Sequence, residues 1–246
     1  MADRYAVVTG AGQGIGRASA QALLADGWTV AVLGRRIEPL QETVAGSDRG
    51  HAITADVGDR AQVEAAFAQV KERFGRLDLL FNNAGRGAPA VDFDELPVED
   101  WNSVVAANLS GTFFCAQAAY RIMKNQSPRG GRIINNGSIS AHAPRPGAAA
   151  YTATKHAVTG LTKQIALDGR KHDITASQID IGNAATPMTD RMTKGVMQPD
   201  GSMMVEPRMD VAHVGRTVAH MASMPLDANI PFLTIMATKM PWLGRG

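Results

Sequence analysis

The stretch Tyr5-Ala-Val-Val-Thr9-Gly10-Ala-Gly-Gln-Gly14-Ile-Gly16 runs from a short β-branched segment into a glycine-rich turn, and a segment of helical period follows directly. Glycine lets the backbone turn tightly and approach a phosphate closely, while a helix N-terminus offers free N–H groups and positive potential. A plain strand-to-helix turn also needs glycine. At the first strand–helix junction of an α/β chain, however, this arrangement favours a nucleotide-binding site.

Outward from this turn, strands and helices alternate along the whole chain. Strands are predicted at residues 5–9, 29–33, 52–54, 77–81, 131–135, 175–179 and 232–236, and helices at 15–25, 39–44, 60–74, 98 to about 124, 150–167 and 211–222. Strict alternation predicts a parallel sheet covered by helices on both faces. Because no repeat or linker interrupts it, we expect one doubly wound domain over residues 1–246. The long irregular stretch after residue 182 predicts a lid at about 183–209.

Composition narrows the classes of protein that the chain can represent. With 45% hydrophobic and 20% charged residues, it is typical of a soluble globular protein. Its net charge is only +2 and its basic residues are scattered, so we expect no nucleic-acid surface. The N-terminus lacks the apolar stretch of a signal peptide, and no apolar run approaches the roughly 20 residues of a membrane span. We therefore expect a cytoplasmic protein with no membrane partner.

Cys115 is the only cysteine, which excludes an internal disulfide and a cysteine-rich metal site. Its apolar neighbours predict a buried structural thiol. We expect no metal.

The glycine spacing resembles one particular family. Gly10, Gly14 and Gly16 form G-x-x-x-G-x-G, which is similar to the classical short-chain dehydrogenase/reductase family, whereas longer two-domain dehydrogenases carry G-x-G-x-x-G. The resemblance extends over nearly the whole chain. It implies a Rossmann-type sheet with strand order 3-2-1-4-5-6-7 and a nicotinamide cofactor.

Four polar residues resemble the catalytic set of that family. Tyr151 and Lys155 stand at i and i+4, on one face of a predicted helix, and a nearby ammonium favours the phenolate of a tyrosine, whose ordinary pKa is about 10. This pairing suits an acid/base group at neutral pH. The resemblance implies that Lys155 also binds the nicotinamide ribose, that Ser138 rather than nearby Ser140 polarises the substrate oxygen, and that Asn108 binds a water of a proton relay.

The end of the second strand indicates which nicotinamide is bound. NAD-binding sites place a carboxylate there to accept hydrogen bonds from ribose hydroxyls, but this chain reads Gly34-Arg35-Arg36. A small residue followed by guanidinium groups accommodates a 2′-phosphate, so we expect NADP(H) in preference to NAD(H). Two observations leave NAD open. The arginines could simply solvate a helix start, and Gln13 stands where many NADP-preferring relatives carry a second basic residue.

The resemblance implies further cofactor contacts. Asp56 matches the aspartate that contacts the adenine amine, although a lone aspartate at a strand end is commonly a cap. The motif Asn82-Asn-Ala-Gly85 lies along the cofactor in the family, and its asparagines also suit ties between strands. The predicted cofactor-binding residues are Gly10, Gln13, Gly14, Ile15, Gly16, Arg35, Arg36, Asp56, Val57, Asn83, Ala84, Gly85, Tyr151, Lys155, Gly182 and Thr186.

The chain departs from the family pattern after the sixth strand, where Ile181 replaces a proline while Gly182 and Thr186 remain. The rim of the substrate pocket is therefore harder to infer. His142 and Arg145 lie between Ser138 and Tyr151 in the sequence; either could meet a carboxylate, but we expect both to face solvent. Six methionines crowd the lid and predict either a soft packed cover or an apolar substrate mouth. They are Met188, Met192, Met197, Met203, Met204 and Met209.

Together these patterns predict an oxidoreductase that transfers a hydride between NADP(H) and a small or medium alcohol or carbonyl substrate. The C-terminal part is similar to family members acting on small 3-hydroxy acids, which favours a 3-hydroxy acid or 3-oxo compound. The alternative is a non-catalytic dinucleotide sensor on the same fold, which would need no activated tyrosine. An epimerase or dehydratase would need a substrate domain that 246 residues hardly accommodate. We expect the apolar tail, Met240–Gly246, to pack against another subunit of a homotetramer or homodimer.

Overall fold

The fold is built around a seven-stranded parallel sheet. The computed structural model describes residues 3–242. The strands follow the order β3-β2-β1-β4-β5-β6-β9, which confirms the predicted order with β9 as the seventh strand. Their bounds are β1 (Tyr5–Thr9), β2 (Thr29–Gly34), β3 (Gly50–Thr54), β4 (Leu79–Asn82), β5 (Gly131–Asn136), β6 (Ile174–Gly182) and β9 (Phe232–Met236).

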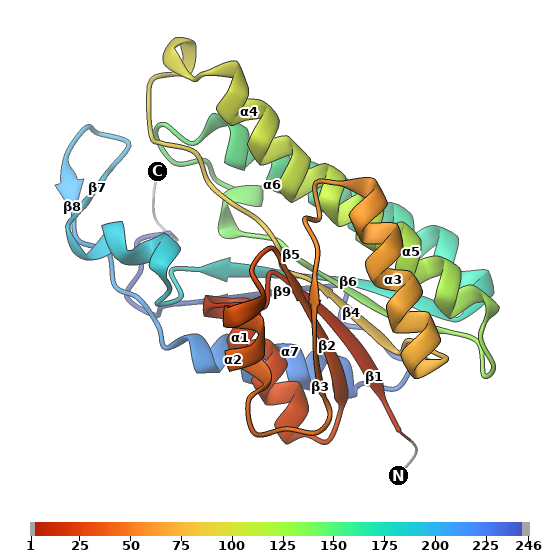
Figure 1. Cartoon of the computed structure of the whole chain (residues 1–246). Coiled ribbons are helices and arrows are strands. Elements are labelled where there is room, and N and C mark those ends of the chain that lie inside the picture. The colour runs from red at the N-terminus through yellow and green to blue at the C-terminus, as the bar shows by residue number, and fades with distance from the viewer. Residues whose placement is uncertain (1–2, 243–246) are drawn as a thin grey trace.

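Helices cover both faces of this sheet, so that it forms the middle of three layers (Figure 1). The first face carries α1 (Gly14–Ala25), α2 (Ile37–Val44) and α7 (Val211–Ser223), and the second carries α3 (Arg60–Phe74), α4 (Val98–Val105), α5 (Gly111–Asn125) and α6 (Ala149–Gly169). Alternate side chains of β1 enter the two layers: Ala6 and Val8 pack toward α1 and α7, and Val7 toward α3 and α5. Both layers are apolar where they meet β1, so this strand lacks a polar face.

The long helix predicted from residue 98 to about 124 is not continuous. It consists of α4, a π-helical turn at Ala106–Ser110, and α5. Asn108 lies in this turn, where its side-chain oxygen accepts the N–H of Arg86 at 2.8 Å and its side-chain nitrogen donates to the carbonyl of Arg86 at 3.0 Å. Single π-turns are frequent at functional sites. The prediction missed the break because the partner lies on a different segment.

The segment predicted as a lid has more structure than the sequence indicated. It contains a 3-10 helix at Pro187–Thr193 and a small antiparallel hairpin of β7 (Val196–Met197) and β8 (Met203–Met204). The hairpin methionines are exposed, whereas Met192 is buried and Met209 packs against the core.

The C-terminal segment after β9 lies close to Gly182, at the end of β6. Met240 is buried, and with Trp242 it packs against Ile139 of the same chain. The described part of the predicted tail thus finds its packing within one chain, while residues 243–246 lie outside the described residues.

Candidate active site

The predicted site residues follow the carboxyl ends of the central strands, where ligands bind in open α/β sheets. In the glycine turn after β1, Gly10 and Gly14 have φ of +63° and +53°, a left-handed backbone that favours glycine. A Cβ on Gly16 would lie 2.3 Å from the carbonyl oxygen of Gly10. Gln13 precedes α1 without a side-chain cap, and Ile15 packs against the core. The uncapped helix N-terminus and close-lying backbone fit a pyrophosphate group.

The motif after β4 ties this strand to β1. The Asn83 side chain donates to the carbonyls of Thr9 at 3.0 Å and Gly10 at 3.2 Å, and the Thr9 hydroxyl accepts the N–H groups of Asn83 and Ala84. A Cβ on Gly85 would lie 3.1 Å from the side-chain oxygen of Asn108. The structural role that the sequence suggested for the asparagines is confirmed.

The arginines after β2 are exposed to solvent. Arg36 directly precedes α2 but makes no side-chain cap, and no described residue forms an ion pair with Arg35 or Arg36. Both guanidinium groups are therefore available to a ligand.

Asp56, after β3, is not a helix cap. Its Oδ1 accepts the N–H of Gly58 at 2.9 Å, which forms a local turn, whereas the helix α3 is capped by Asp59. Val57 is buried and packs against Gly111 at the start of α5. The Asp56 carboxylate is thus held next to the edge strand β3, and its contact with the adenine stays a prediction.

Gly182 and Thr186 connect the sixth strand to the glycine turn. Gly182 ends β6, and a Cβ there would lie 2.8 Å from the Cβ of Met236 on β9. The Cγ2 of Thr186 lies 3.1 Å from where a Cβ of Gly14 would stand, so the segment after β6 lies against the glycine turn. Ile181, in place of the family's proline, continues β6 and pairs with Ile235.

Ser138 and Tyr151 line the same cavity, of about 270 Å³. Ser138 follows β5 and Tyr151 lies in the first turn of α6, so two elements bring the hydroxyls to one pocket. The other walls are largely apolar and include Ala88, Leu96, Ile139, Ile181, Met188 and Met192. Two of the lid methionines therefore line the pocket.

Lys155 is buried beneath Tyr151. Its ammonium lies 5.5 Å from the centroid of the Tyr151 ring and donates to the carbonyl oxygen of Asn136 at 2.6 Å. Asn108 is also buried, and its side chain donates to the Thr154 hydroxyl at 3.3 Å. The fold thus brings all four predicted catalytic residues to the start of α6.

Two charged clusters beside the pocket were missed by the sequence analysis. Arg145, expected to face solvent, is only 11% exposed at its side chain and pairs with the buried carboxylate of Glu206. His142 is exposed as expected, but its Nε2 lies 2.8 Å from Oδ2 of buried Asp180. The signal that could have revealed Asp180 is its place between two isoleucines of a buried strand, because charged residues are rarely buried without partners.

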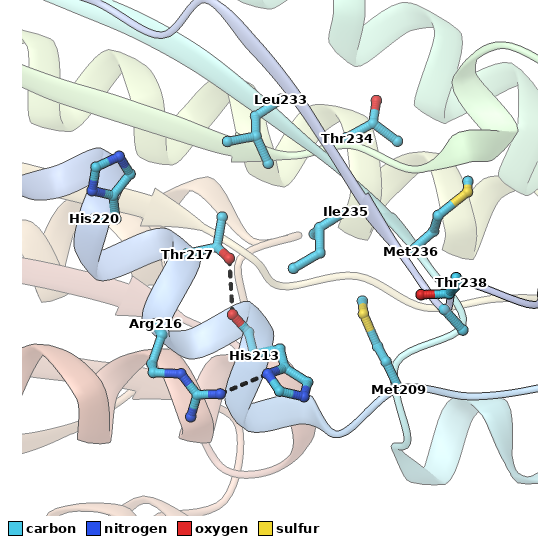
Figure 2. A pocket seen from close by; sticks show the side chains of 11 residues that line it. Met209, His213, Arg216, Thr217, His220, Leu233, Thr234, Ile235, Met236 and Thr238 are labelled. Atoms are coloured by element: carbon cyan, nitrogen blue, oxygen red, sulfur yellow. Dashed lines mark hydrogen bonds between the residues drawn. The ribbon is translucent and has the colours of Figure 1, made fainter.

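A wider groove of about 730 Å³ lies elsewhere, between α7 and β9 (Figure 2). The guanidinium of Arg216 approaches Nδ1 of His213 at 2.6 Å there, and the Thr217 hydroxyl donates to the carbonyl of His213. Figure 2 shows these side chains along α7, with Leu233 and Ile235 of the neighbouring strand β9 also lining the groove. The groove shares no lining residue with the Ser138–Tyr151 pocket, so the predicted chemistry belongs to the smaller cavity.

Two further features concern the described residues. Among residues 3–242, no His, Cys, Asp and Glu side chains gather into a group of three or more that could hold a metal ion. Within the same residues, no helix is both long and apolar enough to cross a membrane.

Comparison with known proteins agrees with this geometry. Residues 4–196 match the family model for short chain dehydrogenase. The chain is 37% identical to a 3beta-hydroxysteroid dehydrogenase of Mediterraneibacter gnavus, over 79% of this chain and 71% of that protein. It is also 37% identical to a gluconate 5-dehydrogenase of Gluconobacter oxydans, over 76% and 73% of the two chains. The structure of a variant of the actinorhodin polyketide ketoreductase with NADPH is similar, with a TM-score of 0.83, 30% identity, and coverage of 95% of this chain and 96% of that one.

The chain therefore belongs to the short-chain dehydrogenase family. It is an NAD(P)-dependent oxidoreductase that acts on the CH–OH group of alcohols or on the corresponding carbonyls.

Proposed function

We propose that this enzyme transfers a hydride between NADP(H) and a small or medium alcohol or carbonyl compound. The observation that carries the cofactor choice is the end of β2, where Gly34 is followed by two exposed arginines without a carboxylate. Guanidinium groups suit a 2′-phosphate, which a carboxylate would repel. The ketoreductase compared above is described with NADPH, which supports the same choice. NAD(H) is the alternative.

The remaining residues of the proposed cofactor site would contact three parts of the cofactor, namely the pyrophosphate, the adenine, and the nicotinamide with its ribose. The glycine turn of Gly10, Gln13, Gly14, Ile15 and Gly16 would hold the pyrophosphate, and Asp56 and Val57 the adenine. Asn83, Ala84, Gly85, Gly182, Thr186, Tyr151 and Lys155 would surround the nicotinamide and its ribose. When bound, the nicotinamide supplies the hydride for reduction or accepts it in oxidation.

The chain's own residues handle the proton. In reduction, the Tyr151 hydroxyl donates its proton to the substrate oxygen, while the Ser138 hydroxyl donates a hydrogen bond to the same atom. The Lys155 ammonium, 5.5 Å from the Tyr151 ring, stabilises the phenolate that remains. We propose that Asn108 binds a water molecule that relays protons between Lys155 and the solvent. Oxidation uses the same groups in reverse.

The pocket favours a short 3-oxo or 3-hydroxy acid as substrate. Its volume of about 270 Å³ and apolar walls suit a small carbon chain. The charged residues that line it are Arg145, which Glu206 neutralises, and Arg191 on the 3-10 helix of the lid. Arg191 is therefore placed to meet a carboxylate, with residues 183–209 closing over the substrate. In this proposal residues 1–246 form one catalytic domain.

The cofactor assignment is tested by thermal-shift titration with NADPH, NADH and their oxidised forms. A ligand that binds the native state raises stability by RT ln(1 + [L]/Kd), so NADPH should give the larger shift. Arg35→Ala should reduce the difference between the thermal shifts with NADPH and with NADH. The control Arg60→Ala, which changes an exposed arginine on α3, should leave this difference unchanged. A larger shift with NADH, or an unaltered difference in Arg35→Ala, would contradict the NADP(H) assignment. Absence of any shift would contradict nicotinamide binding itself.

The substrate class is tested by following NADPH absorbance with 3-oxobutanoate and with its ethyl ester. Arg191→Ala should raise KM for the anion about tenfold and leave KM for the neutral ester unchanged. Equal effects on both probes would refute the role of Arg191.

Tyr151→Phe should lower kcat at least about 100-fold while the NADPH thermal shift persists. Binding of NADPH without turnover of any carbonyl probe by the wild type would favour the dinucleotide sensor.

We also propose a homodimer or homotetramer in the cytoplasm. Its support is the exposure of large apolar side chains, Phe113 at 43%, Leu167 at 55% and Phe232 at 42%, on α5, α6 and β9. Light scattering of the purified enzyme at micromolar concentration measures the mass, and a monomer with full activity would contradict the assembly.

A further inference from the structure

Asp180 is a carboxylate within the core of the sheet. Its side chain is only 1% exposed, in β6 between Ile179 and Ile181, both buried. Burial of a carboxylate costs free energy unless hydrogen bonds compensate it. Because a polar or apolar residue of similar size would fold at lower cost, the presence of Asp180 calls for a function.

The partners of Asp180 connect it to the catalytic serine. Its Oδ1 accepts the backbone N–H of Ser138 at 2.9 Å and the side-chain amide of Gln178 at 2.8 Å. Its Oδ2 lies 2.8 Å from Nε2 of His142, whose side chain is 45% exposed. A Cβ on Gly137 would lie 2.0 Å from Oδ1, so the backbone turn after β5 is wrapped tightly around this carboxylate.

The orientation of the Ser138 hydroxyl depends on that turn. The backbone of Ser138 is extended, at φ −171° and ψ 154°, and its Oγ accepts the N–H of Ser140 at 3.1 Å. Because the backbone uses only a lone pair of Oγ, the hydroxyl proton remains available to donate into the pocket that Ser138 lines. A rotation of the Ser138 peptide would move Oγ away from the substrate oxygen.

We propose that Asp180 is a positioning residue for Ser138, and that His142 completes its hydrogen bonding from the solvent side. The carboxylate fixes the Ser138 N–H, and the imidazole and amide donors satisfy the buried negative charge. Without these donors, the charge would oppose the negative charge that develops on the substrate oxygen during reduction. The inference rests on the proposed role of Ser138 in catalysis and adds the group that holds it.

A double-mutant cycle tests this dependence, with ethyl 3-oxobutanoate and NADPH as the probe pair. Asp180→Ala should lower kcat about 10- to 100-fold, because a small misplacement of a catalytic group costs this much, with little change in KM. Asp180→Asn should recover kcat to within about fivefold, because its amide oxygen can still accept the Ser138 N–H. In a Ser138→Ala background, Asp180→Ala should change the residual rate less than about threefold.

The matched control is Ser177→Ala on the same strand. Ser177 is also buried, but its hydroxyl donates to the side-chain oxygen of Asn229 at 2.8 Å rather than to Asp180 or Ser138. It should leave kcat within about twofold of the wild type. If Asp180→Ala lowers kcat by the same factor in the wild-type and Ser138→Ala backgrounds, Asp180 supports the fold in general and the positioning proposal is wrong. Equal activity of Asp180→Ala and the wild type would also overturn it.

Hydrogen exchange of the Ser138 amide, measured by NMR, separates this proposal from the proposed function. The amide should be protected in the wild type and in Asp180→Asn, and should exchange at least about tenfold faster in Asp180→Ala. If the wild type reduces no carbonyl probe, the proposed function fails but this measurement still decides the positioning. Equal protection in all three proteins then refutes it.

Discussion

The guanidinium of Arg145 donates to both carboxylate oxygens of Glu206, at 2.8 and 2.6 Å, across 61 residues of sequence. Arg145 lies in the segment between Ser138 and α6, and Glu206 in the segment between β8 and α7. The side chain of Asn183 donates to the same carboxylate at 2.8 Å, and that of Gln198 at 3.2 Å. One buried carboxylate therefore joins the pocket-lining residues Arg145 and Asn183 to Gln198, which follows β7.

Acid should weaken this junction. Burial raises the pKa of Glu206, but hydrogen bonds from Arg145, Asn183 and Gln198 and the charge of Arg145 outweigh it, and the pKa falls from 4.5 to about 2. The folded state thus binds this proton less readily than the unfolded state. The resulting stability, roughly 3 kcal/mol, is fully present above about pH 4.5 and is lost as the pH falls toward 2.

Urea unfolding between pH 5 and pH 3 measures this effect. The wild type should lose stability over that range, and Glu206→Gln, which carries no titrating carboxyl there, should lose less. Parallel pH dependences in the two proteins would show that Glu206 does not contribute.

Breaking one partner of the Arg145–Glu206 pair should cost more than removing both. Arg145→Met leaves the Glu206 charge buried and should destabilise the fold by about 3–5 kcal/mol. Arg145→Met combined with Glu206→Leu should recover most of this loss, because no charge remains buried. The exposed pair Arg60–Glu64 on α3 serves as the control, since Glu64→Gln should cost less than about 1 kcal/mol. A double variant as unstable as the single one would argue against a charge effect.

Two glycine-to-alanine substitutions should have different effects: one should weaken NADPH binding, and the other should raise the stability of the fold. Gly16→Ala would place a Cβ 2.3 Å from the Gly10 carbonyl oxygen and 2.5 Å from the side chain of Asn83, so the turn must move. We expect NADPH binding to weaken at least about tenfold. Gly160→Ala, in the exposed middle of α6 with no atom near the added Cβ, should raise stability by about 0.5–1 kcal/mol. Calorimetric titration and urea unfolding give the two readouts. Unchanged NADPH affinity in Gly16→Ala would contradict the close backbone packing.

The thiol of Cys115 should be inert in the native enzyme. Burial against α3 and the sheet raises its pKa to about 12, and the thiolate is the reactive form. With the folded protein at pH 8, Ellman's reagent should release no thionitrobenzoate within an hour. After unfolding in guanidinium chloride, it should release one equivalent per chain. Prompt stoichiometric labelling of the folded protein would place the thiol at the surface instead.

The features that the sequence predicted best are local or periodic. The glycine turn follows from spacing within seven residues, and Tyr151 and Lys155 share a helix face because four residues make about one turn. The buried strands have apolar side chains on both faces, so their runs are recognisable without knowledge of their partners. The order of the strands in the sheet was implied by the family resemblance, because apolar runs do not specify which strands pair.

Other features depended on contacts between distant segments. The π-turn at Asn108 forms around the backbone of Arg86, and the solvent-facing role expected for Arg145 was wrong because Glu206 pairs with it. Nothing in the local sequence of Asn108 or Arg145 specifies such a partner, because the partners Arg86 and Glu206 both lie in irregular segments.

The sequence by itself determined the alternating fold, the glycine turn before α1 and the tyrosine–lysine pair, because each depends on spacings within one strand, turn or helix. Only the tertiary structure decided how Ser138 is held by Asp180 and how Arg145 is neutralised by Glu206. These contacts join residues 42 and 61 positions apart, and such hydrogen bonds to buried carboxylates form only where the packed core excludes water and fixes both partners.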